Sequence, residues 1–581
     1  MAKDARHHNR LLVKVIDENA ERTPEVILIR YAGSDWETAG YKTITWKQLA
    51  GAINKAAYWL DARLCIGRTH TIAYLGPNDA RYYFLLGGAI KTGRRLLIPD
   101  GRVTVEGTLS LLDQTQCNLL ITADEQIEKA KELVAVRPEL EIITIPSLEH
   151  FMDNESTPHY PYTKTWDETK DEIAYIIHTS GTTGRPKPIY HTNGFIGIWG
   201  TYEYLAQRHW PKRLTYDHIF DSCLLTTCPP QWIAGIASLF FTAFNRAVIV
   251  TLPTDMVFPL KVQDVVKIIQ ANHVTGLFTP PSLIEDFSHD ETAFSVLKGL
   301  DFVMFAGAQL DQAVGDILSR FTNLHTVIGS TETGPQPSFQ SADPSAWNTF
   351  DFIPETGARF EPVSGSDDLY ELYLDRHPES ELFQGGFNVF RDRDSIPTHE
   401  LYSPRVFADN TTRWIFHSRS DDLVKLSWLA KFSATDIEDA IARHPRVRSV
   451  YTGGEGRDVP FIIIELHDRH CLDENNNGIN NNNKNNTNNP SPSSQTELLD
   501  EIYNQAITAV NANGIGEICI PRETVMLADP AKPFPRTVKM TIIRKEVERC
   551  YAEKIEAMYR RWEEVRKTKK REVQHGVDGI K

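Results

Sequence analysis

The sequence predicts an α/β protein with a large N-terminal domain of mainly parallel sheets covered by helices, plus a small C-terminal α+β domain. Three observations lead to this prediction. The chain has 581 residues, which is more than one hydrophobic core usually supports. Helical patterns alternate with short apolar, β-rich runs through roughly the first four hundred residues, as they do in βαβ units. Near residue 419 this alternation gives way to shorter elements.

In the N-terminal part, a helical pattern over residues 45–64 precedes a strand-like run at residues 69–76. The longest apolar run, residues 233–250, carries Asn245 and Arg246 near its middle. The part of this run that precedes Asn245 is too short to cross a bilayer. We therefore expect a buried helix followed by a strand.

The C-terminal part begins with the polar, turn-like segment near residue 419. Residues 434–444 then have a helical pattern, and residues 459–468 resemble a strand. We therefore place the large domain at residues 1–420 and the small domain at residues 421–565.

Two segments of the C-terminal part are predicted to lie outside any core. Residues 473–499 form an asparagine-rich insert whose few apolar side chains cannot offset the entropy of ordering it, so we expect a disordered surface loop. Residues 566–581 form a charged tail that we expect to face solvent.

Composition excludes several classes of protein. The net charge of -15 argues against a protein that coats duplex DNA or RNA, which needs a clustered basic excess. The first residues lack the apolar core and cleavage site of a secretory signal, so we expect a cytoplasmic protein. Seven cysteines with no CxxC spacing indicate reduced thiols rather than a disulfide framework or a zinc site.

One loop contains the residue types that bind an anion. In the stretch IIHTSGTTGRPKP, residues 176–188, apolar β-formers run into hydroxyl residues and glycines and close on a lysine. Glycines let the backbone approach a ligand closely, and successive amides and hydroxyls form a nest for an anion. The pattern differs from a Walker loop because no Ser or Thr follows the lysine. We therefore expect this loop to hold phosphate.

This loop closely resembles the signature loop of the adenylate-forming superfamily, which contains acyl-CoA synthetases, luciferases of the firefly type and adenylation domains of nonribosomal peptide synthetases (NRPS). Further segments resemble that family's motifs in the expected order, namely residues 227–236, 276–284, 304–310, 328–334, 418–426 and 535–541. Residues 73–93 and 160–168 look most similar to the adenylation domains of fungal NRPS-like carboxylic acid reductases.

The resemblance implies an AMP-forming ligase. It would activate a carboxylic acid with ATP and Mg²⁺, release pyrophosphate and form an acyl-adenylate. The acyl group would pass to the phosphopantetheine thiol of a carrier protein, for later reduction by another domain. Because neither a carrier nor a reductase domain is present up to Lys581, we expect an excised domain or a stand-alone enzyme. Neither nucleic acid nor a membrane is an expected partner.

The resemblance also implies roles for single residues. Lys539 would be the catalytic lysine, Thr331 would bond phosphate, and Glu332 would help to hold Mg²⁺. Asp421 would be the hinge about which a mobile small domain turns. The expected ATP-binding residues are Thr179, Ser180, Gly181, Thr182, Thr183, Gly184, Lys187, Gly307, Ala308, Gly329, Ser330 and Arg419. The expected acid pocket consists of Gln231, Trp232, Gly235 and Ala306, and its apolar character with one aromatic wall suits an aryl or medium aliphatic acid.

Four departures from the family pattern keep alternatives open. Ile328 stands where many members have an aromatic residue, and Met540 replaces a glycine. The family's ribose-binding aspartate aligns with Val406, and residues 426–431 lack the family's Asn-Gly turn. The alternatives are an acyl-CoA ligase and a catalytically inactive adenylate-fold protein that binds nucleotide or a partner.

Overall fold

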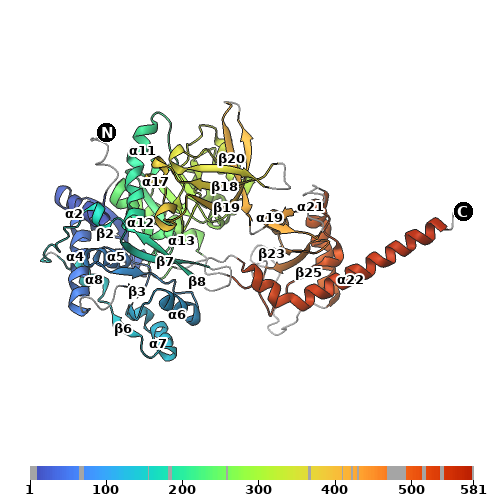
Figure 1. Cartoon of the computed structure of the whole chain (residues 1–581), viewed down its shortest axis with the longest axis horizontal. Helices are drawn as coiled ribbons and strands as arrows, with labels where there is room; N and C mark the ends of the chain where they lie inside the picture. Colours follow the sequence, from blue (N-terminus) through green and yellow to red (C-terminus); the bar gives the residue numbers. More distant parts are fainter. Residues whose placement is uncertain are drawn as a thin grey trace.

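The structure is a computed structural model. It describes residues 10–64, 71–154, 156–180, 186–256, 260–363, 368–407, 410–420, 423–427, 431–467, 492–512, 518–536 and 542–578. The predicted fold class is confirmed, because a large body of mainly parallel sheets and helices is followed by a smaller α+β part (Figure 1).

Two mainly parallel sheets form the centre of the large body. The first has six strands in the order β6-β5-β3-β4-β7-β8, all parallel except β8. Its strands are β3 (Thr71–Leu75), β4 (Arg95–Leu97), β5 (Leu119–Thr122), β6 (Glu141–Thr144), β7 (Ile173–Ser180) and β8 (Pro186–Thr192). The second has seven strands in the order β13-β12-β11-β9-β10-β1-β2, all parallel except β2. They are β1 (Ile27–Tyr31), β2 (Lys42–Thr45), β9 (Cys223–Thr226), β10 (Val248–Val250), β11 (Gly276–Thr279), β12 (Phe302–Phe305) and β13 (Asn323–Thr326).

Helices fill the space between the two sheets and cover their outer faces. The central layer holds α2 (Leu12–Arg22), α4 (Trp46–Arg63), α5 (Arg81–Thr92) and α12 (Ile233–Asn245), whose apolar side chains share one core with both sheets. The outer face of the seven-stranded sheet is covered by α13 (Val262–Asn272), α14 (Pro281–Ser288), α15 (Glu291–Lys298) and α16 (Gln312–Leu318). The outer face of the six-stranded sheet is covered by α6 (Val105–Gln114) and α7 (Ile127–Val136). Shorter helices are α3 (Trp36–Ala39), α8 (Leu148–Met152), α9 (Trp166–Thr169), α10 (Asn193–Gly197), α11 (Tyr202–His209), α17 (Pro378–Phe383) and α18 (Gly386–Val389).

Local sequence signals explain where these helices begin. Thr45 and Gln48 form a capping box at the start of α4, in which each side chain bonds the backbone N–H of the other residue. The predicted helix within residues 233–250 is α12 and the predicted strand is β10, so that expectation is confirmed. No helix in the described part of the chain is both long and apolar enough to cross a membrane.

A third, antiparallel sheet follows the parallel ones and was not predicted. Its order is β16-β20-β19-β18-β17, with β16 (Thr349–Phe350), β17 (Ala358–Pro362), β18 (Tyr370–Asp375), β19 (Ser395–Val406) and β20 (Thr412–Arg419). A cluster of mostly aromatic side chains, including Phe350, Phe387 and Tyr402, forms its core, and Ile328 packs against this cluster.

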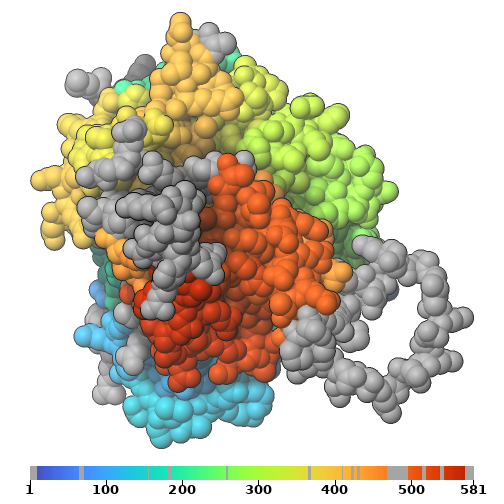
Figure 2. All heavy atoms as spheres, turned by 90° about the vertical axis from the view of Figure 1, so that its right-hand side faces the viewer, coloured from blue at the N-terminus to red at the C-terminus, as the bar shows by residue number. Residues whose placement is uncertain are grey.

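The C-terminal part has apolar clusters of its own, formed entirely by residues from Val424 onward. Its elements are β21 (Leu423–Lys425), β22 (Lys431–Ser433), α19 (Ala434–Ala442), β23 (Val447–Gly453), β24 (Phe461–Leu466), α20 (Pro492–Ile502), α21 (Thr508–Ala512), β25 (Val525–Leu527) and α22 (Arg544–Asp578). It lies over the middle of the large body when viewed from its own side (Figure 2), and Arg443 approaches Asp311 of the large body to 3.7 Å. The end of α22 projects away from both parts (Figure 1).

One boundary in this part was predicted incorrectly. Residues 492–499 belong to the stretch that we expected to be a disordered loop, yet they form most of α20. Leu498 and Leu499 of this helix pack against the apolar cluster of the C-terminal part, and this burial supplies the ordering energy that the asparagine-rich composition lacks. The remainder of the insert lies outside the described residues.

Candidate active site

The candidate site lies where the carboxyl ends of strands from both parallel sheets meet. In open α/β sheets, ligands bind in the crevice outside these ends. In the seven-stranded sheet, a hydrogen bond of 2.9 Å joins the hydroxyls of Thr227, directly after β9, and Thr279, the last residue of β11. The six-stranded sheet contributes β7, which leads into the predicted phosphate loop.

The phosphate loop connects β7 and β8, which pair as an antiparallel hairpin. The register places Thr179 opposite Lys187 and Ser180 opposite Pro186. The side chain of Lys187 is exposed to solvent. The loop residues between them, Gly181, Thr182, Thr183 and Gly184, lie outside the described residues.

A second hairpin carries Thr331 and Glu332. Its strands are β14 (Gly329–Ser330) and β15 (Gly334–Pro335). Gly329 has φ 154°, and a Cβ atom there would overlap the backbone of Gly334, so this tight pairing requires glycine. The backbone N–H of Thr333 donates to Ser330 Oγ (3.1 Å), which closes the turn. Thr331 is buried and Glu332 is half-buried at the tip.

His191 of β8 joins the two hairpins, and sequence reasoning missed it. Its Nε2 atom lies 2.7 Å from the carbonyl oxygen of Thr331, and because a carbonyl only accepts, Nε2 carries the hydrogen. The ring is fully buried and stacked on Phe195, with ring centroids 3.9 Å apart. Burial lowers the pKa of His191 to about 3, so the imidazole is neutral near pH 7. The available sequence signal was a histidine three residues after the phosphate-loop stretch.

The loop after β12 contains Gly307 and Ala308, both exposed. Gly307 has φ 97°, and no atom lies within 4 Å of the place where its Cβ would be, so this backbone has open space beside it. Gln309 fixes the loop against the antiparallel sheet, because its Nε2 donates to the carbonyl oxygens of Phe416 (3.1 Å) and His417 (2.5 Å).

Arg419 ends β20, and the residue paired with it on β19 is Glu400. In the sequence, Val406 stands where the family has its ribose-binding aspartate. In the structure, Val406 lies at the other end of the β19–β20 ladder, where it is 69% exposed. Tyr402 donates its hydroxyl to Glu400 Oε2 (2.9 Å). Burial raises the pKa of Glu400 to about 7, against the opposing effects of the Tyr402 hydrogen bond and the Arg419 charge. Glu400 is thus an acidic residue paired with Arg419 across the ladder, and sequence reasoning did not identify it.

The expected acid-pocket residues Gln231 and Trp232 follow β9 and lie at the start of α12. Gln231 is buried, and its Nε2 donates to Tyr82 Oη (2.7 Å) and Asn78 Oδ1 (3.0 Å). Trp232 is partly exposed, and its indole Nε1 donates to Asp100 Oδ2 (3.1 Å). Both side chains are thus held by residues of the other half of the large body.

Asp100 is itself held by a basic partner. Arg102 donates through Nε to Oδ1 (2.9 Å) and through Nη2 to Oδ2 (2.7 Å), and its guanidinium lies 5.2 Å from the centroid of the Trp232 ring. Burial acts to raise the pKa of Asp100, but the hydrogen bonds and charge of Arg102 outweigh burial, so the pKa is lowered. Asp100 is therefore a carboxylate ion beneath Trp232.

The other two expected pocket residues differ in their surroundings. A Cβ atom on Gly235 would overlap the carbonyl oxygen of Pro229, so this glycine permits the close approach of α12 to the preceding turn. Ala306 directly follows β12 and is partly buried against the central core. Lys539 and Asp421 lie outside the described residues, and so do Met540 and the centre of the 426–431 loop.

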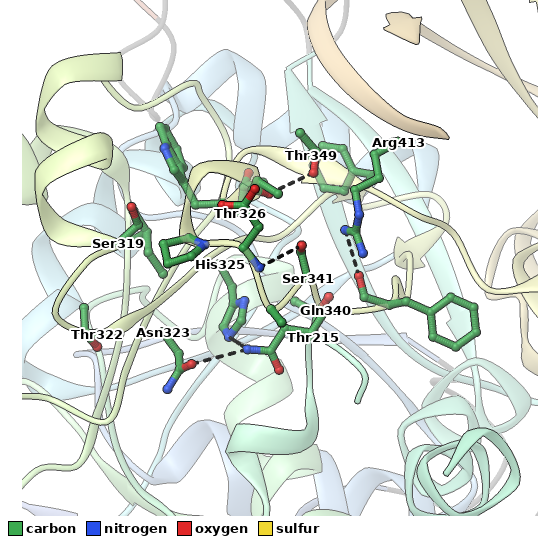
Figure 3. Close-up of a pocket in the computed structure, with 18 residues that line it drawn as sticks. Thr215, Ser319, Thr322, Asn323, His325, Thr326, Gln340, Ser341, Thr349 and Arg413 are labelled. Atoms are coloured by element: carbon green, nitrogen blue, oxygen red, sulfur yellow. Dashed lines mark hydrogen bonds between the residues drawn. The ribbon is translucent and has the colours of Figure 1, made fainter. Parts of the chain in front are cut away.

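A separate hollow of about 100 Å³ lies beside β13, the edge strand of the seven-stranded sheet (Figure 3). Its polar side chains are hydrogen-bonded within the wall: Gln340 donates to Asn323 Oδ1 (3.4 Å), and Arg413 donates to the backbone carbonyl oxygen of Phe339 (3.2 Å). Burial lowers the pKa of His325 in its wall to about 3. These contacts lie along the unpaired edge of β13. The chain leads from β13 directly to the Thr331–Glu332 hairpin.

Comparison with known proteins identifies the family. The sequence profile described as AMP-binding enzyme matches residues 16–353, more than half of the chain, and that of the AMP-binding enzyme C-terminal domain matches residues 421–563. A carboxylic acid reductase of Neurospora crassa is 27% identical over 95% of this chain and 50% of its own length. The adenylate-forming reductase Nps9 of Serpula lacrymans is 24% identical over 89% of this chain and 46% of its own length. The chain thus spans about half the length of these relatives.

Solved structures show the same fold. The anthranilate CoA ligase AuaEII in complex with anthranoyl-AMP has a TM-score of 0.64 at 16% identity, covering 94% of this chain and 97% of the other. ATP-bound MatB from Rhodopseudomonas palustris has a TM-score of 0.64 at 15% identity, covering 94% and 99%. With the profile match, the two hairpins and the ordered motifs in agreement, this chain belongs to the AMP-binding enzyme family, among the adenylate-forming enzymes and close to fungal NRPS-like reductases.

Proposed function

We propose that this chain activates a carboxylic acid with ATP and forms an acyl-adenylate. The observation that carries the proposal is the bond between His191 and the Thr331 carbonyl. This bond holds the phosphate-loop hairpin and the Thr331–Glu332 hairpin together at the ends of the strands. A loop suited to phosphate, a hydroxyl and a carboxylate then belong to one site.

In this reaction a carboxylate oxygen of the acid bonds to the α-phosphorus of ATP as the bond to pyrophosphate breaks. Such a transfer depends mainly on positioning and on stabilisation of negative charge. We assign Lys187 and the hydroxyls and amides of residues 179–184 to the phosphates. Thr331 would hydrogen-bond the phosphate next to them, and Lys539 would offset the charge that develops between carboxylate and α-phosphate.

Glu332 fits a role in holding Mg²⁺. Its carboxylate is half-buried at the hairpin tip, and no hydrogen bond or ion pair joins it to another described residue. Mg²⁺ prefers oxygen ligands and retains several waters beside one or two carboxylates and substrate phosphates. When bound there, the ion would neutralise charge on the phosphates, and Glu332 would orient it from the protein side.

The adenosine would lie between the exposed loop at Gly307 and Ala308 and the backbone of Gly329 and Ser330. The open space beside Gly307 supports this placement. We assign Glu400 and Arg419 to the ribose and the adjoining phosphate, because a carboxylate accepts hydrogen bonds from ribose hydroxyls while the guanidinium pairs with an anion. Glu400 would thereby take the role expected of an aspartate in the family.

The acid would be held by Gln231, Trp232, Gly235 and Ala306. Its acceptor would be a phosphopantetheine thiol on a carrier protein, a proposal supported by the relatives named as reductases, which extend beyond the matched region. We further propose residues 1–420 and 421–565 as two domains that turn about Asp421 between the two half-reactions. The separate apolar clusters of the two parts support this division.

Exchange of labelled pyrophosphate into ATP tests this function. In the presence of Mg²⁺, a panel of aryl, aliphatic and amino acids should contain members that stimulate exchange, and Glu332→Ala should abolish the stimulation. Absence of exchange across the panel with folded protein would support an inactive adenylate-fold protein instead. Supplying either coenzyme A or a phosphopantetheinylated carrier then identifies the acceptor, and efficient thioester formation with coenzyme A would favour an acyl-CoA ligase.

A further inference from the structure

Asp100 connects the wall of the proposed acid pocket to the strand that leads into the phosphate loop. It follows β4 and lies beside β7, where its backbone N–H donates to His178 Nε2 (3.1 Å). Its carboxylate accepts from the indole of Trp232, which follows β9 of the other sheet. One residue therefore links the ends of three strands drawn from both parallel sheets.

The surroundings of Asp100 make this link rigid. The carboxylate is only 5% exposed, and it accepts one hydrogen bond from Trp232 and three from Arg102, two from its guanidinium and one from its backbone N–H. Its ionised form is stabilised by Arg102, and hydrogen bonds to an ionised acceptor are about twice as strong as neutral ones. The indole N–H thus has a strong, fixed partner, which selects one orientation of the Trp232 ring.

Arg102 restricts the ring further. Its guanidinium lies over the indole at 5.2 Å from the ring centroid, within the range of a cation–π contact. Because one face of the indole is occupied by Arg102, a ligand can stack only on the opposite face. A flat, immobile aromatic face favours a flat partner, since offset stacking of aromatic rings adds to their burial.

We infer that Asp100 and Arg102 are positioning residues that hold Trp232 as a fixed wall of the acid pocket and thereby select aryl acids over aliphatic ones. The inference rests on the proposed function, because it takes the space beside Trp232 to be the acid site. Neither residue needs to touch the acid. They act through the orientation of the indole.

The test compares Asp100→Asn, Trp232→Phe and the double variant in the pyrophosphate exchange assay, with benzoate and hexanoate as the aryl and aliphatic probes. Asp100→Asn keeps the side-chain volume but removes the charge that holds Arg102. We expect the KM for benzoate to rise roughly tenfold, the difference between a charged and a neutral hydrogen-bond acceptor. The KM values for ATP and hexanoate should change less than twofold.

A double-mutant cycle separates positioning from general damage. In the Trp232→Phe background the indole N–H is absent, so adding Asp100→Asn should change the KM for benzoate less than twofold. Asp61→Asn is the matched control, because Asp61 also pairs with an arginine, Arg94 (2.7 Å), but does so away from the proposed site. Arg102→Met, at a side chain that is 41% exposed, repeats the test if Asp100→Asn folds poorly.

A spectroscopic measurement reports directly on the environment of the Trp232 ring. In protein labelled with 5-fluorotryptophan, the ¹⁹F resonance that disappears in Trp232→Phe belongs to Trp232. Asp100→Asn should shift or broaden that resonance, and Asp61→Asn should leave it unchanged. An unaltered resonance, or an equal rise of the ATP and benzoate KM values, overturns the inference. Absence of exchange with every acid in the wild-type chain overturns the proposed function and with it the acid pocket.

Discussion

Replacing His191 with glutamine should remove a defined part of the pH dependence of folding stability. In the folded chain His191 is neutral and fully buried, with its pKa lowered from 6.5 to about 3 by burial. As the pH falls below 6.5, the unfolded chain takes up a proton at this residue while the folded chain does not. The folded state is therefore favoured in full above pH 6.5 and loses stability progressively down to about pH 3.

The size of the effect follows from this shift. Each pH unit between the two pKa values lowers the free energy of unfolding by about 1.4 kcal/mol, so the wild type loses about 1.4 kcal/mol from His191 between pH 7.5 and pH 5.5. Glutamine keeps an N–H group for the Thr331 carbonyl but does not titrate. At pH 7.5 we expect His191→Gln to be less stable than the wild type by about 1–3 kcal/mol, because ring stacking is lost and the hydrogen bond is weakened.

Urea unfolding of the large domain at the two pH values measures this difference. The stability gap between His191→Gln and the wild type should shrink by about 1.4 kcal/mol at pH 5.5. His159→Gln, which replaces an exposed histidine, is the matched control. The difference in unfolding free energy between His159→Gln and the wild type should be the same at the two pH values. An identical gap for His191→Gln at both pH values would refute a buried neutral imidazole at this position.

Three further predictions concern the active site and the insert. Lys539→Ala should slow adenylation by roughly 10²–10³-fold while ATP binding survives, and thioester formation from preformed acyl-adenylate should suffer much less, as single-turnover assays of each half-reaction would reveal. Equal loss in both assays would contradict this role. Glu332→Gln should raise the Mg²⁺ concentration that gives half-maximal exchange, measured by titration with MgCl₂, because a neutral amide binds the ion less well than a carboxylate; an unchanged midpoint would argue against the metal assignment. Deletion of residues 473–491 should leave the melting temperature nearly unchanged, whereas deletion of residues 473–499 should lower it by several degrees because it removes the partly buried leucines of α20 that pack against the apolar cluster. Equal melting temperatures for the two deletions would show that this helix contributes little.

The alternation of helices and parallel strands could be predicted because each element carries its own local signal. The capping box of Thr45 and Gln48 starts α4, and the apolar run of residues 233–250 produced the helix and strand expected of it. The antiparallel sheet of residues 349–419 was missed because the pairing of its strands with one another is decided by tertiary contacts. The helix at residues 492–499 was missed for the same kind of reason, because two leucines in polar surroundings signal burial only once their partners are known.

The contiguous motifs of the site could also be recognised in the sequence alone. The phosphate loop and the Thr331–Glu332 segment are short runs whose glycines and hydroxyls must be neighbours in the chain to shape the backbone around an anion. Because this requirement concerns neighbouring residues only, it can be recognised in a short stretch of sequence. The sequence by itself therefore determined the fold class, the family resemblance and the segments that we propose to bind nucleotide.

The partners that hold those segments in place were decided only by the tertiary structure. His191 and Thr331 are 140 residues apart, and Asp100 and Trp232 are 132 residues apart. Glu400 is paired with Arg419 only through the register of β19 and β20. A hydrogen bond between distant residues depends on which strands lie side by side and where their ends meet. No run of consecutive residues encodes that arrangement, because it arises from the burial of both sheets against one shared layer of helices.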